Sequence, residues 1–123
     1  MLRASILLGA VLALPAGSTA GEPEKKVGLS VLYVGNASSP RGKAYADFLG
    51  KHFRAVETAE RKGFDPKRAE TFDVVVLDWS QQDRPEKPAS PLGPKDAWSK
   101  PTVLLGSAGL LLAQAWEIVG TIG

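Results

Sequence analysis

The chain has 123 residues, no cysteine, a single histidine and a formal charge of +2 at pH 7. The missing thiols exclude disulfides, cysteine nucleophiles and thiolate metal sites. A charge this weak indicates neither nucleic acid nor an anionic membrane as a partner.

The first twenty residues, MLRASILLGAVLALPAGSTA, have the pattern of a secretory signal peptide. A basic Arg3 precedes an apolar run, and small residues at Ser18 and Ala20 predict cleavage after Ala20. Arg3 is one of the 15 basic residues, so 14 remain beside 13 acidic residues in the mature chain. The apolar run is too short to span a bilayer, and no later segment has about 18 consecutive apolar residues. We therefore expect an exported protein, periplasmic or extracellular, with a disordered leader at 21–26.

The segment 27–35, VGLSVLYVG, predicts a strand that leads through a tight loop into a helix. Ser39 is expected to cap this helix and Pro40 to occupy its first position. The helix carries an apolar stripe suited to packing on a sheet. Its members recur at spacings of three and four: Tyr45, Phe48, Leu49, His52 and Phe53. A second, short strand is expected at 55–58.

Residues 72–80, FDVVVLDWS, give the clearest strand pattern, because four consecutive apolar residues lie between polar ends. A short helix capped by Asp65 is expected before it, at 65–70. The segment 81–101 that follows contains five prolines and is expected to be a loop rather than a helix. This loop is interpreted as a lid, an interaction surface or a plain crossover, and the sequence leaves the three open.

The segment KPTVLLGSAGLLLAQAW predicts a strand at 102–105, a turn at 106–109 and a helix to about residue 116. The last residues, EIVGTIG, have the pattern of another strand, so we expect the domain to be incomplete at its C-terminus. Alternation of strands and helices predicts an α/β fold, a three-layer, flavodoxin-like or Rossmann-like, doubly wound and mainly parallel sheet over 27–123.

In such sheets, ligands bind beyond the carboxyl ends of the strands. The polar residues that the predicted topology places at this edge are Asn36, Ser38, Ser39, Asp78, Ser80 and Ser107. They are the predicted ligand-binding residues. The loop at 35–39 could hold an anion at the helix N-terminus, although it lacks a phosphate-loop motif.

Ser107 is the candidate nucleophile, since a strand-to-helix turn can expose a side chain beside backbone N–H groups. The G-x-S-x-G spacing is broken, because Leu105 stands at the first glycine position. The chain has no histidine after Ser107 to serve as its base, and His52 falls in the apolar stripe. A structural or ligand-binding serine is therefore favoured. Asp78 ends a buried strand, where it either caps a turn or faces a ligand.

On the segments VLYVGN, FDVVVLDWS and PTVLLGSAGLLLAQAW, the chain resembles the class I glutamine amidotransferase-like superfamily, including the ThuA-like, trehalose-utilisation type. Ser107 stands where the nucleophile elbow of that superfamily carries its cysteine. The resemblance implies a flavodoxin-like fold and the location of the pocket. It does not imply amidotransferase activity, because the histidine and glutamate that complete the triad have no counterpart in this chain.

Two further resemblances are weaker. Asp78 and Ser107 match the strand ends of response-regulator receiver domains, but Gly35 and Asn36 replace the acidic pair that binds magnesium there. The segment VLYVGNASSPRGKA partly resembles the phosphate loop of flavodoxins. We expect a small polar ligand, with a sugar-related compound as one candidate, and no cofactor or metal. A serine hydrolase that uses Ser107 and a noncatalytic interaction domain remain alternatives.

Overall fold

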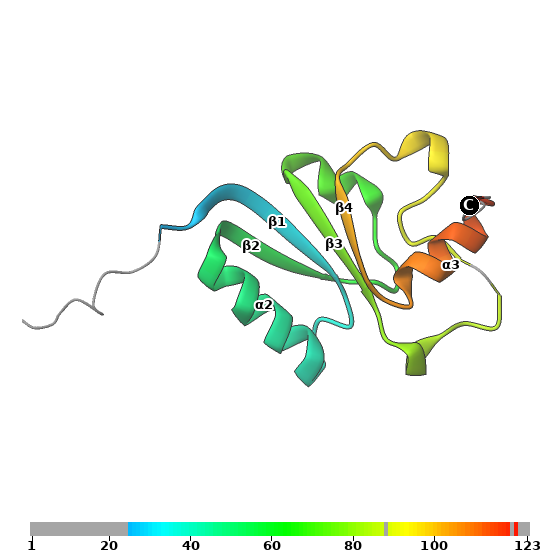
Figure 1. Cartoon of the computed structure of the whole chain (residues 1–123), viewed down its shortest axis with the longest axis horizontal. Coiled ribbons are helices and arrows are strands. Elements are labelled where there is room, and N and C mark those ends of the chain that lie inside the picture. Colours follow the sequence, from blue (N-terminus) through cyan, green and yellow to red (C-terminus); the bar gives the residue numbers. More distant parts are fainter. Residues whose placement is uncertain (1–24, 88, 119, 121–123) are drawn as a thin grey trace, which may run out of the picture.

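The computed structural model describes residues 25–87, 89–118 and 120, so the predicted signal peptide lies outside the described residues. Four parallel strands form one sheet in the order β2-β1-β3-β4 (Figure 1). Their bounds are Val27–Gly35 for β1, Phe53–Glu60 for β2, Val74–Trp79 for β3 and Thr102–Gly106 for β4. The helices are α2 (Pro40–His52) and α3 (Ala108–Ala115), with short 3-10 helices η2 (Pro66–Thr71), η3 (Gln81–Asp83) and η4 (Lys95–Ala97).

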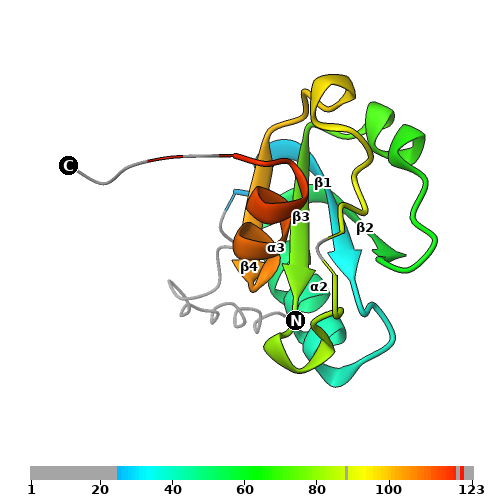
Figure 2. The same cartoon turned by 90° about the vertical axis from the view of Figure 1, so that its right-hand side faces the viewer.

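The sheet is covered by α2 on one face and by α3 on the other, as Figures 1 and 2 show. Side chains alternate between the faces along each strand. On the α2 face, Val31 and Tyr33 of β1 pack with Val76 of β3 and with Leu49 of the helix. The opposite face buries a larger cluster under η2, α3 and the segment 81–101. Its members include Leu32, Val34, Val75, Leu77, Trp79, Leu92, Ala108 and Leu111.

The strand order confirms the predicted fold class, an α/β sheet of the flavodoxin-like or Rossmann-like type. The chain runs first through β1, which lies inside the sheet. The next strand, β2, pairs with one edge of β1, and β3 then pairs with its other edge. The order therefore reverses between β1 and β3. In open parallel sheets such a reversal leaves a crevice at the carboxyl ends of the two strands.

The start of α2 is as predicted, whereas its apolar stripe is only half buried. Ser39 caps the helix through its hydroxyl and Pro40 begins it. Leu49 is buried, but Phe48 is 57% exposed and its ring lies 4.7 Å from the ring of His52. The stripe prediction is wrong at these two positions, because the spacing does not say how wide a helix face the sheet covers. It is also wrong at Phe53, which begins β2 and is not part of the helix.

The crossover segment 81–101 is a loop that packs on the core. Leu92 is 1% exposed in the larger cluster, and the indole of Trp116 donates a hydrogen bond to the carbonyl of Gly93 at 2.8 Å. Among its described residues, only the short turns η3 and η4 are helical. The strands predicted at 27–35, 55–58, 72–80 and 102–105 are found, and β2 extends beyond 55–58 because its backbone pairs with β1 from Phe53 to Glu60.

The turn from β4 into α3 requires glycine at one position. Gly106 has φ +65°, and a Cβ there would lie 2.4 Å from the carbonyl oxygen of Trp79. The helix begins at Ala108, so the predicted turn at 106–109 is shorter than expected. It ends where Glu117 adopts φ 52° and Ile118 N–H donates to the Ala113 carbonyl at 2.9 Å. The strand expected at 117–123 falls largely outside the described residues.

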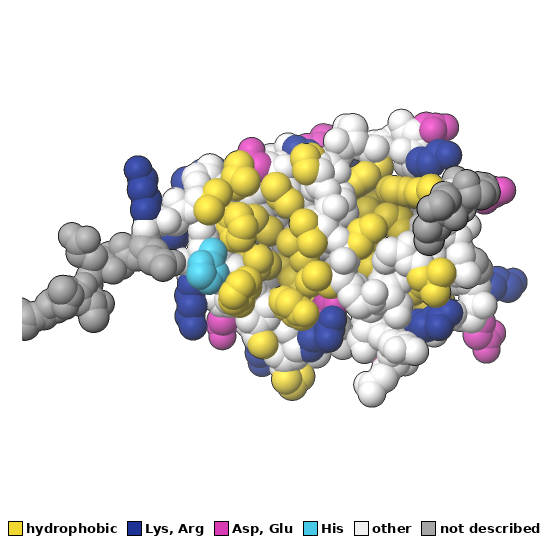
Figure 3. All heavy atoms as spheres, viewed as in Figure 1, with side chains coloured by type: hydrophobic (Ala, Val, Ile, Leu, Met, Phe, Trp, Pro, Cys, Tyr) yellow, Lys and Arg dark blue, Asp and Glu magenta, His cyan; other side chains and the backbone are white. Residues whose placement is uncertain are grey.

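Apolar side chains also gather on the surface in the view of Figure 3. The exposed large apolar residues include Phe48 of α2, Val103 and Leu104 of β4, and Leu110 of α3. Val103 is 48% exposed although it lies in a sheet, because β4 is the last strand of the described sheet. No helix among the described residues has the length and apolar character needed to cross a membrane.

Candidate functional site

The crevice at the carboxyl ends of β1 and β3 brings four of the predicted residues around one cavity of about 400 Å³. Its walls come from the loop before α2, the first turn of α2, the end of β3 and η3. The lining residues are Asn36, Ser39, Pro40, Arg41, Arg61, Asp78, Ser80, Gln82 and Asp83. The predicted Asn36, Ser39, Asp78 and Ser80 are among them, whereas Ser38 and Ser107 are not.

Asp78 is paired inside the protein. Its side chain is 3% exposed, and it accepts hydrogen bonds from Arg41 Nε at 2.9 Å and Arg41 Nη2 at 2.8 Å. The hydroxyl of Tyr33 donates a third bond at 2.6 Å. A bidentate arginine is the strongest neutralising partner that a buried carboxylate can have. Asp78 therefore serves mainly to fix Arg41 at the cavity, and it does not cap a turn.

The contacts among Asp78, Arg41 and Tyr33 shift the pKa of all three side chains. Burial alone would raise the pKa of the Asp78 carboxyl, but hydrogen bonds from Arg41 and Tyr33 outweigh it and hold the pKa below its usual range. Burial, together with the hydrogen bond to Asp78, raises the pKa of the Tyr33 phenol. The hydrogen bond to Asp78 likewise raises the pKa of Arg41. All three groups keep their charge states at neutral pH.

The loop at 36–39 uses its polar groups to begin the helix. The Ser39 hydroxyl accepts a bond from the Gly42 N–H at 3.0 Å and donates to the Asn36 carbonyl at 2.6 Å. Gly42 allows this close fold, because a Cβ there would lie 2.3 Å from the same carbonyl. The backbone N–H of Ser38 donates to Glu60 Oε1 at 3.2 Å, and its hydroxyl donates to Asn36 Oδ1 at 3.4 Å. The Asn36 side chain remains exposed beside the cavity.

Ser107 immediately precedes α3, and its backbone N–H links the turn before the helix to β3. Its N–H donates to the carbonyl of Trp79 at 2.7 Å, while its hydroxyl makes no capping bond to the helix. A serine nucleophile needs a base beside it. His52 ends α2, whose start and not its end lies at the cavity. The structure thus places Ser107 and the single histidine at different ends of the fold.

Sequence reasoning missed five of the cavity residues, two of which are arginines: Pro40, Arg41, Arg61, Gln82 and Asp83. Arg41 follows Pro40 in the first helical turn, where an arginine is usually solvated, and only the position of Asp78 beneath it shows its role. Arg61 is the first residue after β2 and is 9% exposed. A strand that ends at residue 60 would have placed Arg61 at the same edge as Asp78, but the short strand predicted at 55–58 did not reach it.

Arg61 is held over the aromatic face of Trp79. Its guanidinium carbon lies 4.4 Å from the ring centroid, and Nη1 donates to the backbone carbonyl of Asp78 at 3.3 Å. Burial lowers the pKa of this guanidinium. Arg61 also lines two neighbouring hollows, one of about 180 Å³ beside Gly35 and Glu60, and one of about 430 Å³ beside Pro85 and Pro91.

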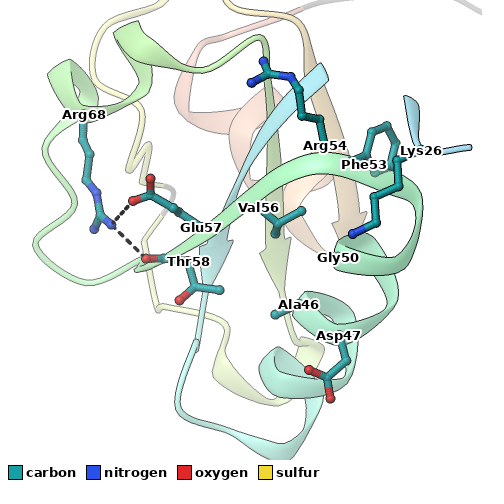
Figure 4. A pocket seen from close by; sticks show the side chains of 10 residues that line it. All are labelled: Lys26, Ala46, Asp47, Gly50, Phe53, Arg54, Val56, Glu57, Thr58 and Arg68. Atoms are coloured by element: carbon teal, nitrogen blue, oxygen red, sulfur yellow. Dashed lines mark hydrogen bonds and ion pairs between the residues drawn. The ribbon is translucent and has the colours of Figure 1, made fainter. Parts of the chain in front are cut away.

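A separate hollow of about 600 Å³ lies between α2 and β2, away from the predicted residues (Figure 4). Arg68 points across it to Glu57 and to the Thr58 carbonyl, at 3.6 and 3.1 Å. Arg54 also borders it and lies 3.9 Å from Asp73. Exposed ion pairs of this kind contribute little to stability, and none of the predicted site residues lines this hollow.

Within the described ranges, no cluster of three or more histidine, aspartate or glutamate side chains is placed to hold a metal ion. The fold and the crevice define an α/β protein with a polar cavity at the switch point of a parallel sheet. Comparison of the chain with models of known families, with curated proteins and with solved structures finds no significant match. The resemblance to the amidotransferase-like superfamily therefore remains an interpretation of the sequence.

Proposed function

We propose that the protein binds a small, hydroxyl-rich ligand, related to a sugar, in the cavity between β1 and β3. The observation that carries the proposal is the composition of the cavity wall. Asn36, Ser80 and Gln82 offer uncharged hydrogen-bonding groups around about 400 Å³, whereas the Ser39 hydroxyl is engaged in the helix cap. That volume lies at the lower end of small-molecule pockets, which hold roughly 300–1,000 Å³, and suits a ligand of monosaccharide size.

The charges of the wall support an uncharged or weakly charged ligand. Arg41 and Asp78 are paired with each other, and the cation Arg61 and the carboxylate Asp83 remain to meet a ligand. A strongly charged ligand would be repelled by the wall group that carries the same sign of charge. A hydroxyl group can donate to a carboxylate and accept from a guanidinium, so a polyol matches both.

We further propose that the cavity belongs to an amidotransferase-like domain that lacks a complete catalytic triad and is exported from the cell. Export rests on the pattern at 1–20. Mass measurement of the protein released by an expressing cell tests it, with cleavage after Ala20 as the expected result and an intact N-terminus as the contrary one.

Binding is tested by isothermal titration of the purified protein with a panel of monosaccharides and polyols. Asn36→Ala and Gln82→Ala remove exposed wall groups without touching the core, so each should weaken the binding of the best panel member about fivefold. Gln114→Ala is the matched control, because it removes an exposed amide of α3 that lines none of the hollows described above. Equal affinities in all three variants would place the ligand elsewhere.

A further inference from the structure

Arg61 is a buried cation with few partners. Its backbone N–H donates to the carbonyl of Gly35 at 2.8 Å, which fixes the residue at the end of β2. A guanidinium has five N–H donors. Within the described part of the chain, only Nη1 of Arg61 finds a protein acceptor, the Asp78 carbonyl at 3.3 Å. Its remaining donors have no acceptor among the described residues. Arg61 is 9% exposed and borders three hollows.

The carboxylates near Arg61 do not pair with it. Asp78 gives its oxygens to Arg41 and Tyr33. Asp83 borders all three hollows and Glu60 borders the smallest of them, but both residues lie at exposed positions. The ion pairs found within 4 Å among the described residues involve Arg41, Arg54 and Arg68, and not Arg61. A buried charge without a paired opposite charge is costly, and a bound anion would offset that cost.

We infer that the ligand is a sugar acid whose carboxylate pairs with the guanidinium of Arg61 while its hydroxyl groups contact the polar wall of the cavity. This inference rests on the proposed function and names its ligand class. A carboxylate matches the planar fork of arginine with two parallel hydrogen bonds. A phosphate dianion fits less well, because Asp83 and Glu60 stand beside Arg61 and would repel the second charge.

The test compares matched pairs of ligands on the unaltered protein. D-glucuronate and D-glucose, and D-galacturonate and D-galactose, differ only in a carboxylate that replaces a hydroxymethyl group. Titration at pH 7 and low ionic strength should show each uronate binding at least about tenfold more tightly than its neutral partner. Inorganic phosphate serves as a third probe and should bind more weakly than either uronate.

Two substitutions assign the preference to Arg61. Arg61→Lys keeps the positive charge but removes the planar guanidinium with its parallel N–H donors. Arg61→Gln removes both the charge and the guanidinium. In each variant, the advantage of the uronate over its neutral partner, measured on that same variant, should fall to within about threefold. Lys67→Gln is the control, because it removes an exposed cation of η2 that lines none of the three hollows. It should leave the uronate preference unchanged.

The possible results distinguish failure of the sugar-acid inference from failure of the proposed function. Uronates and neutral sugars that bind equally well would overturn the sugar-acid inference and leave the proposed function standing. A uronate preference that survives in both Arg61 variants would also overturn it, since the carboxylate would then lie elsewhere. If no sugar, uronate or polyol binds the unaltered protein, the proposed function fails and the inference fails with it. The comparison on the unaltered protein is decisive even where a variant does not fold.

Discussion

The guanidinium of Arg41 holds the carboxylate of Asp78 through Nε at 2.9 Å and Nη2 at 2.8 Å, and so ties the first turn of α2 to the end of β3. The two residues are separated by 37 positions in the sequence. Because the pair bridges the point where the strand order reverses, it fixes the wall of the cavity as well as the packing of the helix.

Replacement of Asp78 by asparagine should destabilise the protein. Asp78→Asn keeps the shape of the side chain but loses the charge that pairs with Arg41, whose own side chain is 44% exposed and can be solvated. We expect a loss of about 2 kcal/mol in the free energy of unfolding, measured by urea denaturation. Asp96→Asn, at an exposed position of η4, is the control and should change it by less than about 0.5 kcal/mol. Equal effects of both substitutions would contradict this role of the pair.

The same carboxylate predicts a dependence of stability on pH. The pKa of Asp78 in the folded state is lowered relative to an ordinary aspartate, because the bonds from Arg41 and Tyr33 outweigh burial. The stabilisation is therefore present at neutral pH and is lost as the pH falls below the ordinary pKa of about 3.9 and through the folded-state value. Asp73, bonded by the N–H and hydroxyl of Ser30, has a lowered pKa too and should add to the acid loss.

Urea denaturation between pH 7 and pH 2.5 checks the sign. The gap in unfolding free energy between the original protein and Asp78→Asn should be widest near pH 7. It should narrow below about pH 4, where the carboxylate of the unfolded chain takes up a proton before that of the folded protein. Asp73→Asn should show a smaller gap of the same sign. A gap for Asp78→Asn that stays constant down to pH 2.5 would mean that the charge of Asp78 contributes nothing.

Glycine at position 106 should be required. Gly106→Ala would place a Cβ 2.4 Å from the Trp79 carbonyl at a φ of +65°, so we expect a loss of more than about 2 kcal/mol in unfolding free energy. Gly50→Ala gives the matched comparison, because Gly50 lies inside α2 with open space around it. Alanine there should stabilise the protein by about 0.5 kcal/mol. The prediction fails if the two substitutions shift the thermal midpoint in the same direction.

Much of the fold can be read from the sequence, because the strands at 27–35 and 72–80 are runs of apolar, β-branched residues and the start of α2 has a serine cap followed by proline. The edge strand β2 was predicted too short. Its alternation is weak, and pairing with β1 defines it instead. The exposure of Phe48 could not be predicted either, since it depends on the width of the sheet beneath α2.

The candidate site could be predicted in part. Topology alone brings Asn36, Ser39, Asp78 and Ser80 to one edge, and the structure places all four around one cavity. Whether Asp78 is free or paired depends on Arg41, whose partner lies 37 residues away, and no local pattern reports such a contact. Ser107 falls outside the cavity because the tight turn at Gly106 directs its backbone to Trp79.

The position of Ser107 predicts the result of a chemical probe. With His52 at the far end of α2, no histidine activates the hydroxyl, so a fluorophosphonate should not label Ser107 above the level of other exposed serines. Mass spectrometry of the treated protein measures this, with Ser107→Ala as the control. Stoichiometric labelling that disappears in Ser107→Ala would revive the hydrolase alternative.

The most direct test of the account is a nuclear magnetic resonance titration of the purified protein with D-glucuronate and D-glucose, which follows the backbone amides of the whole chain. The account predicts that the largest shifts cluster at Asn36, Arg41, Arg61, Ser80 and Gln82, around the crevice between β1 and β3. Shifts that cluster instead at the hollow between α2 and β2, or the absence of any shift at millimolar ligand, would contradict it.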